Sequence, residues 1–300
     1  INCARGGLVD EIALKESLEN GKVASAALDV FVNEPPKDSK LLGTKNLILT
    51  PHLGASTTEA QEKVAIQIAE QICNFLKTGA ISNAVNTFSL SAKEYNLVKP
   101  YLRLSNLLGS FAGQLTENAI KKIEVEFEGQ ASKVNTQPLV QTLICSLLKS
   151  TFDNVNIINA MSVVKDKSID VTETKHDRVC EYQSCITLSI TTDKQKRSVK
   201  GTLFGNKPRI VSIKGIKIEA ELLKHNLYIS NEDKPGFVSN LSKILADNNI
   251  NIATFHLGRK DSGGEAVALI STDNFIDNSV IGKIKKLPLV IQAKYITFDD

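Results

Sequence analysis

Apolar residues in the first fifty positions follow two different spacings. Residues 23–30 and 46–50 are short, nearly continuous apolar runs, a pattern typical of parallel strands that are covered on both faces. Residues 10–20 carry leucines four positions apart, which predicts a helix with one apolar face that Asp10 can cap. We therefore expect the end of a doubly wound α/β domain, in which ligands gather beyond the carboxyl ends of the strands.

A long amphipathic helix is predicted after the second apolar run. Ser56 and Glu59 have the spacing of a capping box, and Gly79 is suited to end the helix. Apolar residues recur between these ends at steps of four, so they form one stripe. We expect the helix to carry the chain out of its first domain and toward another one. The stripe consists of Ala60, Val64, Ile68, Ile72 and Leu76.

The pattern changes near residue 84, where a linker over residues 84–91 is expected to precede a mixed α/β domain. A helix over residues 95–117 is predicted to turn Leu97, Leu104 and Phe111 inward. Stretches in which apolar and polar residues alternate predict half-exposed strands. The further elements expected here are a helix over residues 138–148 and strands over residues 123–127, 185–191 and 210–218.

Residues 222–300 show the clearest succession of signals. Alternating strands and amphipathic helices follow one another in the order β-α-β-β-α-β, which is that of a ferredoxin-like fold. Turns are predicted at residues 233–236 and 261–264, both of which contain glycine. The fold class expected for the whole chain is α/β.

Length and composition narrow the class of protein. A chain of 300 residues is long enough for two or three domains. Its 42% apolar and 23% charged residues are those of an ordinary globular protein, and no apolar run approaches the ~18 residues of a membrane span. A net charge of +3 and only 5% aromatic residues argue against nucleic acid as a partner. Small molecules are the expected ligands.

The cysteines suggest neither a metal site nor a disulfide framework. They are five in number, scattered, and never spaced as Cys-x-x-Cys. We interpret Cys3, Cys73, Cys145, Cys180 and Cys185 as reduced thiols and expect a cytoplasmic protein. Because the chain starts at Ile1, inside what reads as an α/β domain, it is interpreted as a fragment, and an organelle transit peptide stays an open question.

Three side chains stand out as candidates for chemistry. His52 directly follows the second apolar run, and imidazole can accept and return a proton near neutral pH. Glu34, in a loop stiffened by two prolines, could hold the second ring nitrogen. Arg5, beside two glycines, offers forked donors that suit a carboxylate.

The order arginine, glutamate, histidine, each in a loop after an apolar strand, resembles the D-2-hydroxyacid dehydrogenase family. Within that family the chain is most similar to the long-form 3-phosphoglycerate dehydrogenases, which carry an intervening and an ACT domain. Four segments support the resemblance: Asn2-Cys3-Ala4-Arg5-Gly6-Gly7, Ala27-Leu28-Asp29-Val30-Phe31, Asn33-Glu34-Pro35-Pro36 and Pro51-His52-Leu53-Gly54-Ala55-Ser56-Thr57.

The resemblance implies a domain plan. Residues 1–83 would be the C-terminal part of the NAD-binding catalytic domain with its crossing helix. Residues 84–221 would be the intervening domain, and residues 222–300 the regulatory ACT domain. Family members assemble through such domains, so a homo-oligomer, specifically a homotetramer, is expected for a complete chain.

The resemblance also implies site roles. In NAD-dependent oxidation of 3-phosphoglycerate, the first step of serine biosynthesis, His52 would take the hydroxyl proton, Glu34 would steady the imidazolium, and Arg5 would clamp the substrate carboxylate. Serine could be an effector of the ACT domain. The cofactor contacts implied are Cys3, Ala4, Arg5, Asp29, His52, Leu53, Gly54 and Ala55, and the effector contacts are Asn231, Asp233 and Asn251.

Each of these positions has a plainer reading. Arg5 could donate hydrogen bonds to carbonyl groups of its own loop. Asp29 and Asn231 could simply form turns, because aspartate and asparagine are common in turns for conformational reasons alone. The family often has histidine at the position of Asn231, and this difference argues against regulation by serine. A basic run could hold an anion such as a phosphorylated substrate, although such runs are more often solvated loops. It consists of Lys194, Lys196, Arg197 and Lys200.

Rival functions also stay open. The chain could belong to another D-2-hydroxyacid dehydrogenase, or to a non-catalytic regulatory protein that binds an amino acid. None of the 17 glycines forms a Gly-x-Gly-x-x-Gly, the unit that holds the pyrophosphate of a dinucleotide. We expect that unit upstream of Ile1, and therefore expect this fragment to be inactive alone.

Overall fold

The computed structural model describes residues 1–86, 88–177 and 181–298. Cys180 lies outside these ranges. The chain divides into two compact units, Ile1–Gly79 and Ala80–Asp300, each of which is described by itself. Among the described residues, no helix combines the length and the apolar character that a membrane crossing requires.

The first unit is built on parallel strands, as the apolar runs predict. Strands β1 (Ala26–Leu28) and β2 (Leu47–Leu49) pair in parallel, and Asn2 forms a parallel bridge with Leu28 on the other side of β1. Both strands are shorter than the runs that predict them. Helix α1 (Glu11–Glu19) begins as predicted, because the Asp10 carboxylate accepts hydrogen bonds from two backbone N–H groups of the first turn.

Helix α2 (Thr58–Thr78) begins one position later than its predicted capping box. The Thr57 hydroxyl caps the helix by accepting a hydrogen bond from Ala60 N, whereas the Ser56 hydroxyl donates to the carbonyl of His52. Gly79 ends the helix in the left-handed conformation, as predicted. No residue of α2 is buried, so its apolar stripe is exposed within this unit.

The second unit opens with helix α3 (Ala92–Leu115), which starts at a capping box between Ser91 and Glu94. It packs closely against α4 (Gln137–Leu148). A Cβ atom at Gly109 would collide with the carbonyl oxygen of Leu143, so glycine permits this approach. The inward face of α3 is as predicted for Leu104 and Phe111, but Leu97 is 61% exposed and its neighbour Val98 is buried in its place.

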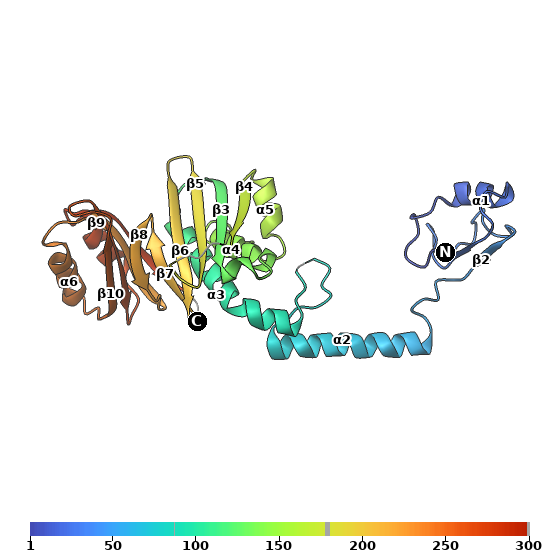
Figure 1. Ribbon diagram of the computed structural model, residues 1–300, viewed down its shortest axis with the longest axis horizontal. Helices are drawn as coiled ribbons and strands as arrows, with labels where there is room; N and C mark the ends of the chain where they lie inside the picture. Colours follow the sequence, from blue (N-terminus) through green and yellow to red (C-terminus); the bar gives the residue numbers. More distant parts are fainter. Residues whose placement is uncertain (87, 178–180, 299–300) are drawn as a thin grey trace. The chain divides into compact units, whose positions relative to one another are not determined.

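A six-stranded sheet in the order β4-β3-β5-β6-β7-β8 lies against α3 (Figure 1). Its strands pair antiparallel except for β3 and β4, which are parallel. The sequence did not predict β4, β6, or the short helices α5 (Ala160–Asp166) and η1 (Gln130–Ser132). The strands are β3 (Ile120–Gly129), β4 (Asp170–His176), β5 (Ser184–Thr192), β6 (Lys196–Phe204), β7 (Lys207–Ile213) and β8 (Ile216–Ala220).

Two predictions in this region are wrong. The strand expected over residues 210–218 is a hairpin of β7 and β8, because Lys214 and Gly215 both adopt positive φ and turn the chain. The basic run is not a solvated loop, since three of its four members lie on strand β6. Lys196 and Lys200 pair there with Glu124 and Glu128 of strand β3 in the same sheet.

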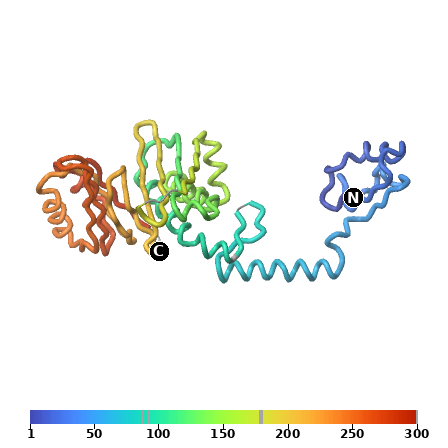
Figure 2. The backbone as a smooth tube through the Cα atoms, in the orientation of Figure 1, coloured from blue at the N-terminus to red at the C-terminus, as the bar shows by residue number. Residues whose placement is uncertain are grey.

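The C-terminal part has the predicted β-α-β-β-α-β order. Its four strands form an antiparallel sheet in the order β10-β11-β9-β12, which the orange and red part of the trace follows in Figure 2. The elements are β9 (His225–Glu232), α6 (Phe237–Asp247), β10 (Ile252–Arg259), β11 (Glu265–Thr272), α7 (Asn278–Lys285) and β12 (Val290–Thr297).

Both faces of this sheet are covered. Leu227 and Ile229 of β9 face helices α6 and α7 in one core. Tyr228, on the opposite face by the two-residue period of a strand, joins the core of the six-stranded sheet and α3. The ferredoxin-like part therefore shares one of its two cores with the rest of the second unit.

Candidate active site

The first unit places three loops side by side at one edge of its parallel sheet. Asn2, β1 and β2 are adjacent parallel segments, and the chain leaves their carboxyl ends toward Arg5, Asp29 and His52 respectively. This is the edge at which open α/β sheets bind ligands. The sequence-based prediction of where Arg5 and Asp29 lie agrees with this arrangement.

The candidate base and acid are in contact. His52 Nδ1 lies 2.7 Å from Glu34 Oε2, and Glu34 Oε1 accepts a hydrogen bond of 3.0 Å from Phe31 N. The His52 hydrogen bond and then the Phe31 N–H hold the pKa of the Glu34 carboxyl below its usual value. With Nδ1 held by a carboxylate, the other ring nitrogen, Nε2, is left for a ligand.

Asp29 holds the histidine loop. Its Oδ1 accepts hydrogen bonds from the Thr50 hydroxyl at 2.6 Å and from Leu53 N at 2.7 Å, and its Oδ2 accepts one from Gly54 N at 3.0 Å. The Thr50 hydroxyl first, and then the Leu53 N–H, lower the pKa of Asp29. The backbones of Leu53 and Gly54 were predicted to contact a cofactor, but their N–H groups donate hydrogen bonds to Asp29.

The backbone of His52 adopts a left-handed conformation with φ of 58°. Such a conformation is uncommon outside glycine, although histidine tolerates it better than most residues. Two local hydrogen bonds support it, from His52 N to Thr50 O at 3.0 Å and from the Ser56 hydroxyl to His52 O at 3.1 Å. The turn and Asp29 together therefore fix the direction of the ring.

Arg5 lies in a loop that Asn2 organises. The Asn2 side chain accepts a hydrogen bond from Ala4 N and donates one to the Arg5 carbonyl, both at 3.0 Å. The exposed Arg5 guanidinium donates to the Ala4 carbonyl at 2.7 Å, and within the described part of the chain no hydrogen bond or ion pair joins it to Glu34 or His52. Its loop is in place, but its side chain makes a local contact.

Two supporting residues escaped the sequence-based analysis. Asn2 is one, and Glu11 of α1 is the other. Glu11 accepts hydrogen bonds from Val32 N at 2.9 Å and from the Ser39 hydroxyl at 3.3 Å, on either side of the loop that carries Glu34. Its partners lie more than twenty residues further along the chain, so it reads in the sequence as an ordinary charge in the first turn of a helix.

The remaining cofactor candidates are open to solvent. Cys3, Ala4 and Ala55 are exposed beside the three loops, and Cys3 is a free thiol. Gly6 brings this segment so close to the next loop that a Cβ atom would collide with the carbonyl of Phe31. Within the described ranges, no group of three or more His, Cys, Asp and Glu side chains is arranged to hold a metal ion.

The predicted effector residues do not line one site within the chain. Asn231 and Arg259 both pair with Ala266, so they lie at the same end of the C-terminal sheet. Asn251 immediately precedes β10 and lies at the opposite end. Asp233 accepts hydrogen bonds from Arg259 Nη1 and Gly263 N. Asn251 instead donates to Asp273. Asn231 and Asp233 are brought near one another, and Asn251 is not.

Comparison with known protein families gives three consecutive matches. Residues 1–54 match the NAD binding domain of D-isomer specific 2-hydroxyacid dehydrogenases. Residues 97–214 match the D-3-phosphoglycerate dehydrogenase intervening domain, and residues 225–289 match the ACT domain.

Individual proteins are similar over nearly the whole chain. The D-3-phosphoglycerate dehydrogenase of Bacillus subtilis is 38% identical over 300 residues, which are 99% of this chain and 57% of that protein. The D-3-phosphoglycerate dehydrogenase of Methanocaldococcus jannaschii is 36% identical over 96% of this chain and 55% of its own length. The chain thus spans about half the length of the curated relatives it matches.

The partial NAD-binding domain with its His–Glu pair, followed by an ACT domain, defines a relative of the D-isomer specific 2-hydroxyacid dehydrogenases. More particularly, the chain is D-3-phosphoglycerate dehydrogenase-like, because the intervening domain stands between these two and the relatives match nearly all of it.

Proposed function

We propose that this chain supplies the proton-transfer residues and the regulatory domains of an NAD-dependent D-3-phosphoglycerate dehydrogenase. The single observation that carries the proposal is the 2.7 Å contact between His52 Nδ1 and Glu34 Oε2 at the ligand-binding edge of the sheet. The names of the most similar relatives supply the substrate, 3-phosphoglycerate.

In the proposed reaction, His52 Nε2 takes the proton of the substrate hydroxyl. Glu34, kept ionised by its lowered pKa, stabilises the imidazolium that forms. Arg5, once its side chain turns from the Ala4 carbonyl toward the ligand, binds the substrate carboxylate with two parallel hydrogen bonds. The proton then passes to solvent, or returns to the carbonyl in the reverse direction.

Bound NAD would accept the hydride that leaves the same carbon. The residues that fit its nicotinamide end are those of the exposed Cys3 and Ala4 segment, which lies at the sheet edge beside the loop of Asp29. Asp29 already uses both carboxylate oxygens, so its part is to keep the His52 loop in place. No Gly-x-Gly-x-x-Gly occurs in the 300 residues, so we propose that the chain alone does not turn over substrate.

An amino-acid effector is a second proposal for the ACT domain. Asn231 supports it, since its Oδ1 is buried and has no hydrogen-bond partner among the described residues. The Asp233 carboxylate lies at the same end of the sheet, where its pairing with Arg259 lowers its pKa. Asn251 could contribute only from another copy of the chain, because it lies at the far end of its own sheet.

A chimeric enzyme tests the catalytic proposal. The matching portion of the Bacillus subtilis relative is replaced by this chain, and NADH formation from 3-phosphoglycerate is measured. We expect an active chimera in which His52→Gln lowers kcat by about 10²–10⁴-fold, the range for a general base. His225→Gln, in the second unit, is the matched control and should leave kcat unchanged. A folded chimera that retains its activity after His52→Gln would contradict the proposal.

A further inference from the structure

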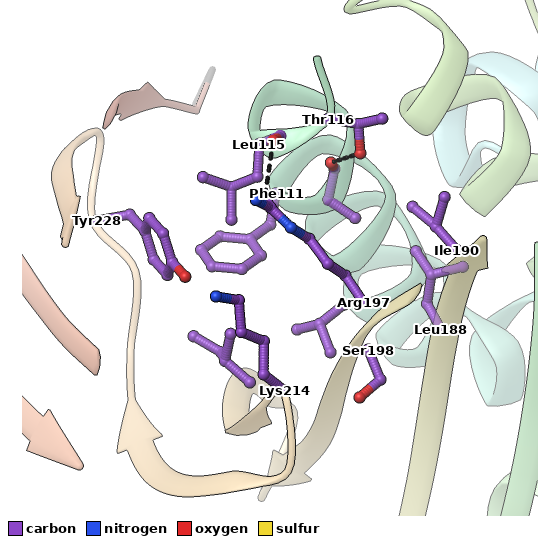
Figure 3. A pocket seen from close by; sticks show the side chains of 12 residues that line it. Phe111, Leu115, Thr116, Leu188, Ile190, Arg197, Ser198, Lys214 and Tyr228 are labelled. Carbon is purple, nitrogen blue, oxygen red and sulfur yellow. Dashed lines mark hydrogen bonds between the residues drawn. The ribbon is translucent and has the colours of Figure 1, made fainter. Parts of the chain in front are cut away.

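The pocket between the two sheets of the second unit is too small for a ligand. Figure 3 shows the side chains that line it, among them Phe111, Arg197 and Tyr228. Its interior has about 20 Å³ of free space, which is room for about one water molecule. The contacts that the proposed chemistry leaves unexplained lie instead in the first unit, around the loop of Glu34.

Glu11 of α1 joins the two ends of that loop. Residues 31–41 form neither helix nor strand, so side chains must hold their path. One carboxylate oxygen of Glu11 accepts a hydrogen bond from Val32 N at 2.9 Å, and the other accepts one from the Ser39 hydroxyl at 3.3 Å. Ser39 Oγ in turn accepts a hydrogen bond from Leu41 N at 3.3 Å. Both ends of the loop are therefore tied to the first turn of α1.

The peptide group between Phe31 and Val32 is held from two sides. Its N–H donates to Glu11. Its carbonyl lies against Gly6, where a Cβ atom would come within 1.9 Å of Phe31 O and 2.7 Å of Val32 N. Only glycine permits so close an approach. Because Gly6 directly follows Arg5, the orientation of this one peptide group depends on α1 and on the Arg5 loop together.

The same segment holds the proposed partner of His52. The preceding N–H group, that of Phe31, donates to Glu34 Oε1 at 3.0 Å, while Glu34 Oε2 lies 2.7 Å from His52 Nδ1. A rotation of the peptide group that Glu11 holds would displace the backbone between Phe31 and Glu34. The carboxylate would then lose its contact with the ring.

We propose that Glu11 is a positioning residue that couples the Arg5 loop to the Glu34–His52 pair. It keeps the Val32 N–H turned toward α1 and the Phe31 carbonyl against Gly6, and in this way it fixes where Glu34 meets His52. Its carboxylate acts through the backbone rather than on the substrate. The inference rests on the proposed function, since it assigns Glu11 a part in the same reaction.

Two conservative variants separate this role from simple charge. An acid in the first turn also favours a helix electrostatically. Glu11→Gln removes the charge but keeps an oxygen that can accept from Val32 N. Glu11→Asp keeps the charge at the helix N-terminus, but its side chain is one methylene shorter and cannot reach both ends of the loop. The proposal predicts that the glutamine variant resembles the native chain and that the aspartate variant does not.

Carboxyl ¹³C NMR titration of the full chain tests the proposal without turnover. Glu11→Ala and Glu11→Asp should raise the pKa of Glu34 toward its usual value, because the carboxylate loses its fixed contacts with His52 and the Phe31 N–H. Loss of a nearby negative charge would by itself lower that pKa, so the sign of the shift in Glu11→Ala identifies the cause. If Glu11→Ala does not fold, Glu11→Asp decides. An unchanged or lowered Glu34 pKa in the folded aspartate variant would overturn the proposal.

Kinetics of the chimera supply the second readout. Glu11→Asp should lower kcat by about tenfold or more, since a misplacement of about 1 Å can cost about 10²-fold, and Glu11→Gln should keep most of the activity. Glu16→Ala, at an exposed glutamate of the same helix, is the matched control and should leave kcat unchanged. Full kcat in Glu11→Asp would contradict the positioning role. If the chimera is inactive, the proposed function fails by itself, and the Glu34 titration alone decides the role of Glu11.

Discussion

At the scale of single residues, the site depends on carboxylate and amide side chains that hold other groups in place. Glu34 holds a ring nitrogen of His52, and Asp29 holds the loop from which that ring projects. Glu11 and Asn2 do the same for the neighbouring loops. The proposed chemistry therefore rests on one histidine whose direction several polar side chains determine.

Removing the ring should change the acid beside it. Because the His52 hydrogen bond is the largest cause of the low pKa of Glu34, His52→Ala should raise that pKa toward its usual value. Carboxyl ¹³C NMR titration of the chain measures it. His176→Ala, in the second unit, should leave the Glu34 titration unchanged. An unaltered Glu34 titration in His52→Ala would show that the two side chains do not interact in solution.

The first unit should lose stability in acid through Asp29. Its pKa is lowered in the folded state, so its contribution is fully present above the unfolded value of about 3.9 and is lost as the pH falls through the folded value. Asp29→Asn should be less stable than the native chain at neutral pH, and the difference should shrink below about pH 4. Thermal unfolding across pH checks this. A difference that stays constant down to pH 2 or so would rule out the linkage.

The sequence was sufficient to predict the site residues whose side chains are typical of catalysis. Arg5, Glu34 and His52 follow apolar runs and were predicted from the sequence, but the present direction of the Arg5 side chain was not. Asn2 and Glu11 were missed, because their partners are set by the folded path of the chain and their types are common at strand ends and in first helical turns.

At the scale of elements, the long helices were predictable and several strand boundaries were not. Apolar periodicity found α3 and α4, whereas β6 was hidden because its lysines pair with acids of other strands instead of facing water alone. The turn between β7 and β8 was missed because only one of its two central residues, Gly215, is a common turn former, while Lys214 beside it also adopts a left-handed conformation. The cap of α2 was misplaced because Ser56 and Thr57 are both suitable N-cap residues. The Ser56 hydroxyl donates to the His52 carbonyl, so Thr57 caps the helix.

The close packing of α3 on α4 can be tested at one glycine. Gly109→Ala should destabilise the chain by about 1–3 kcal/mol, because the added methyl collides with the Leu143 carbonyl. Gly282→Ala is the control, since its Cβ atom would meet nothing within 4 Å in helix α7, and it should be neutral or stabilising by up to about 1 kcal/mol. Urea unfolding measures both variants. Equal stabilities for the two would contradict the packing.

At the scale of the whole molecule, the second unit combines two sequence-defined domains around a shared core. Leu227, Tyr228 and Ile229 of β9 form a continuous apolar run, which is typical of a strand covered on both faces, but no periodicity says what covers the second face. In the structure that cover is α3 and the six-stranded sheet, with Tyr228, Val267, Leu269 and Ile296 in the common core. The expected boundary near residue 222 thus divides two domains in the sequence, but side chains from both domains pack in one common core.

A substitution in the shared core should affect both parts together. Leu269→Ala, at a side chain 1% exposed, should cost about 2–5 kcal/mol and lower hydrogen-exchange protection in β5 as well as in β9. Ile291→Ala, at a side chain 61% exposed, should change stability by less than about 0.5 kcal/mol. Loss of protection confined to residues 222–298 would mean that the two parts unfold independently.

The most direct test of the central claim, that Glu34 sets His52 to receive a proton at Nε2, is the tautomer of that ring. Long-range ¹H–¹⁵N NMR of the chain at about pH 9, well above the ordinary imidazole pKa of about 6.5, distinguishes the two nitrogens. We predict that His52 carries its proton on Nδ1, donated to Glu34, and that Glu34→Ala abolishes this preference. A proton on Nε2 in the native chain would contradict the account, because that nitrogen could then accept nothing from a substrate.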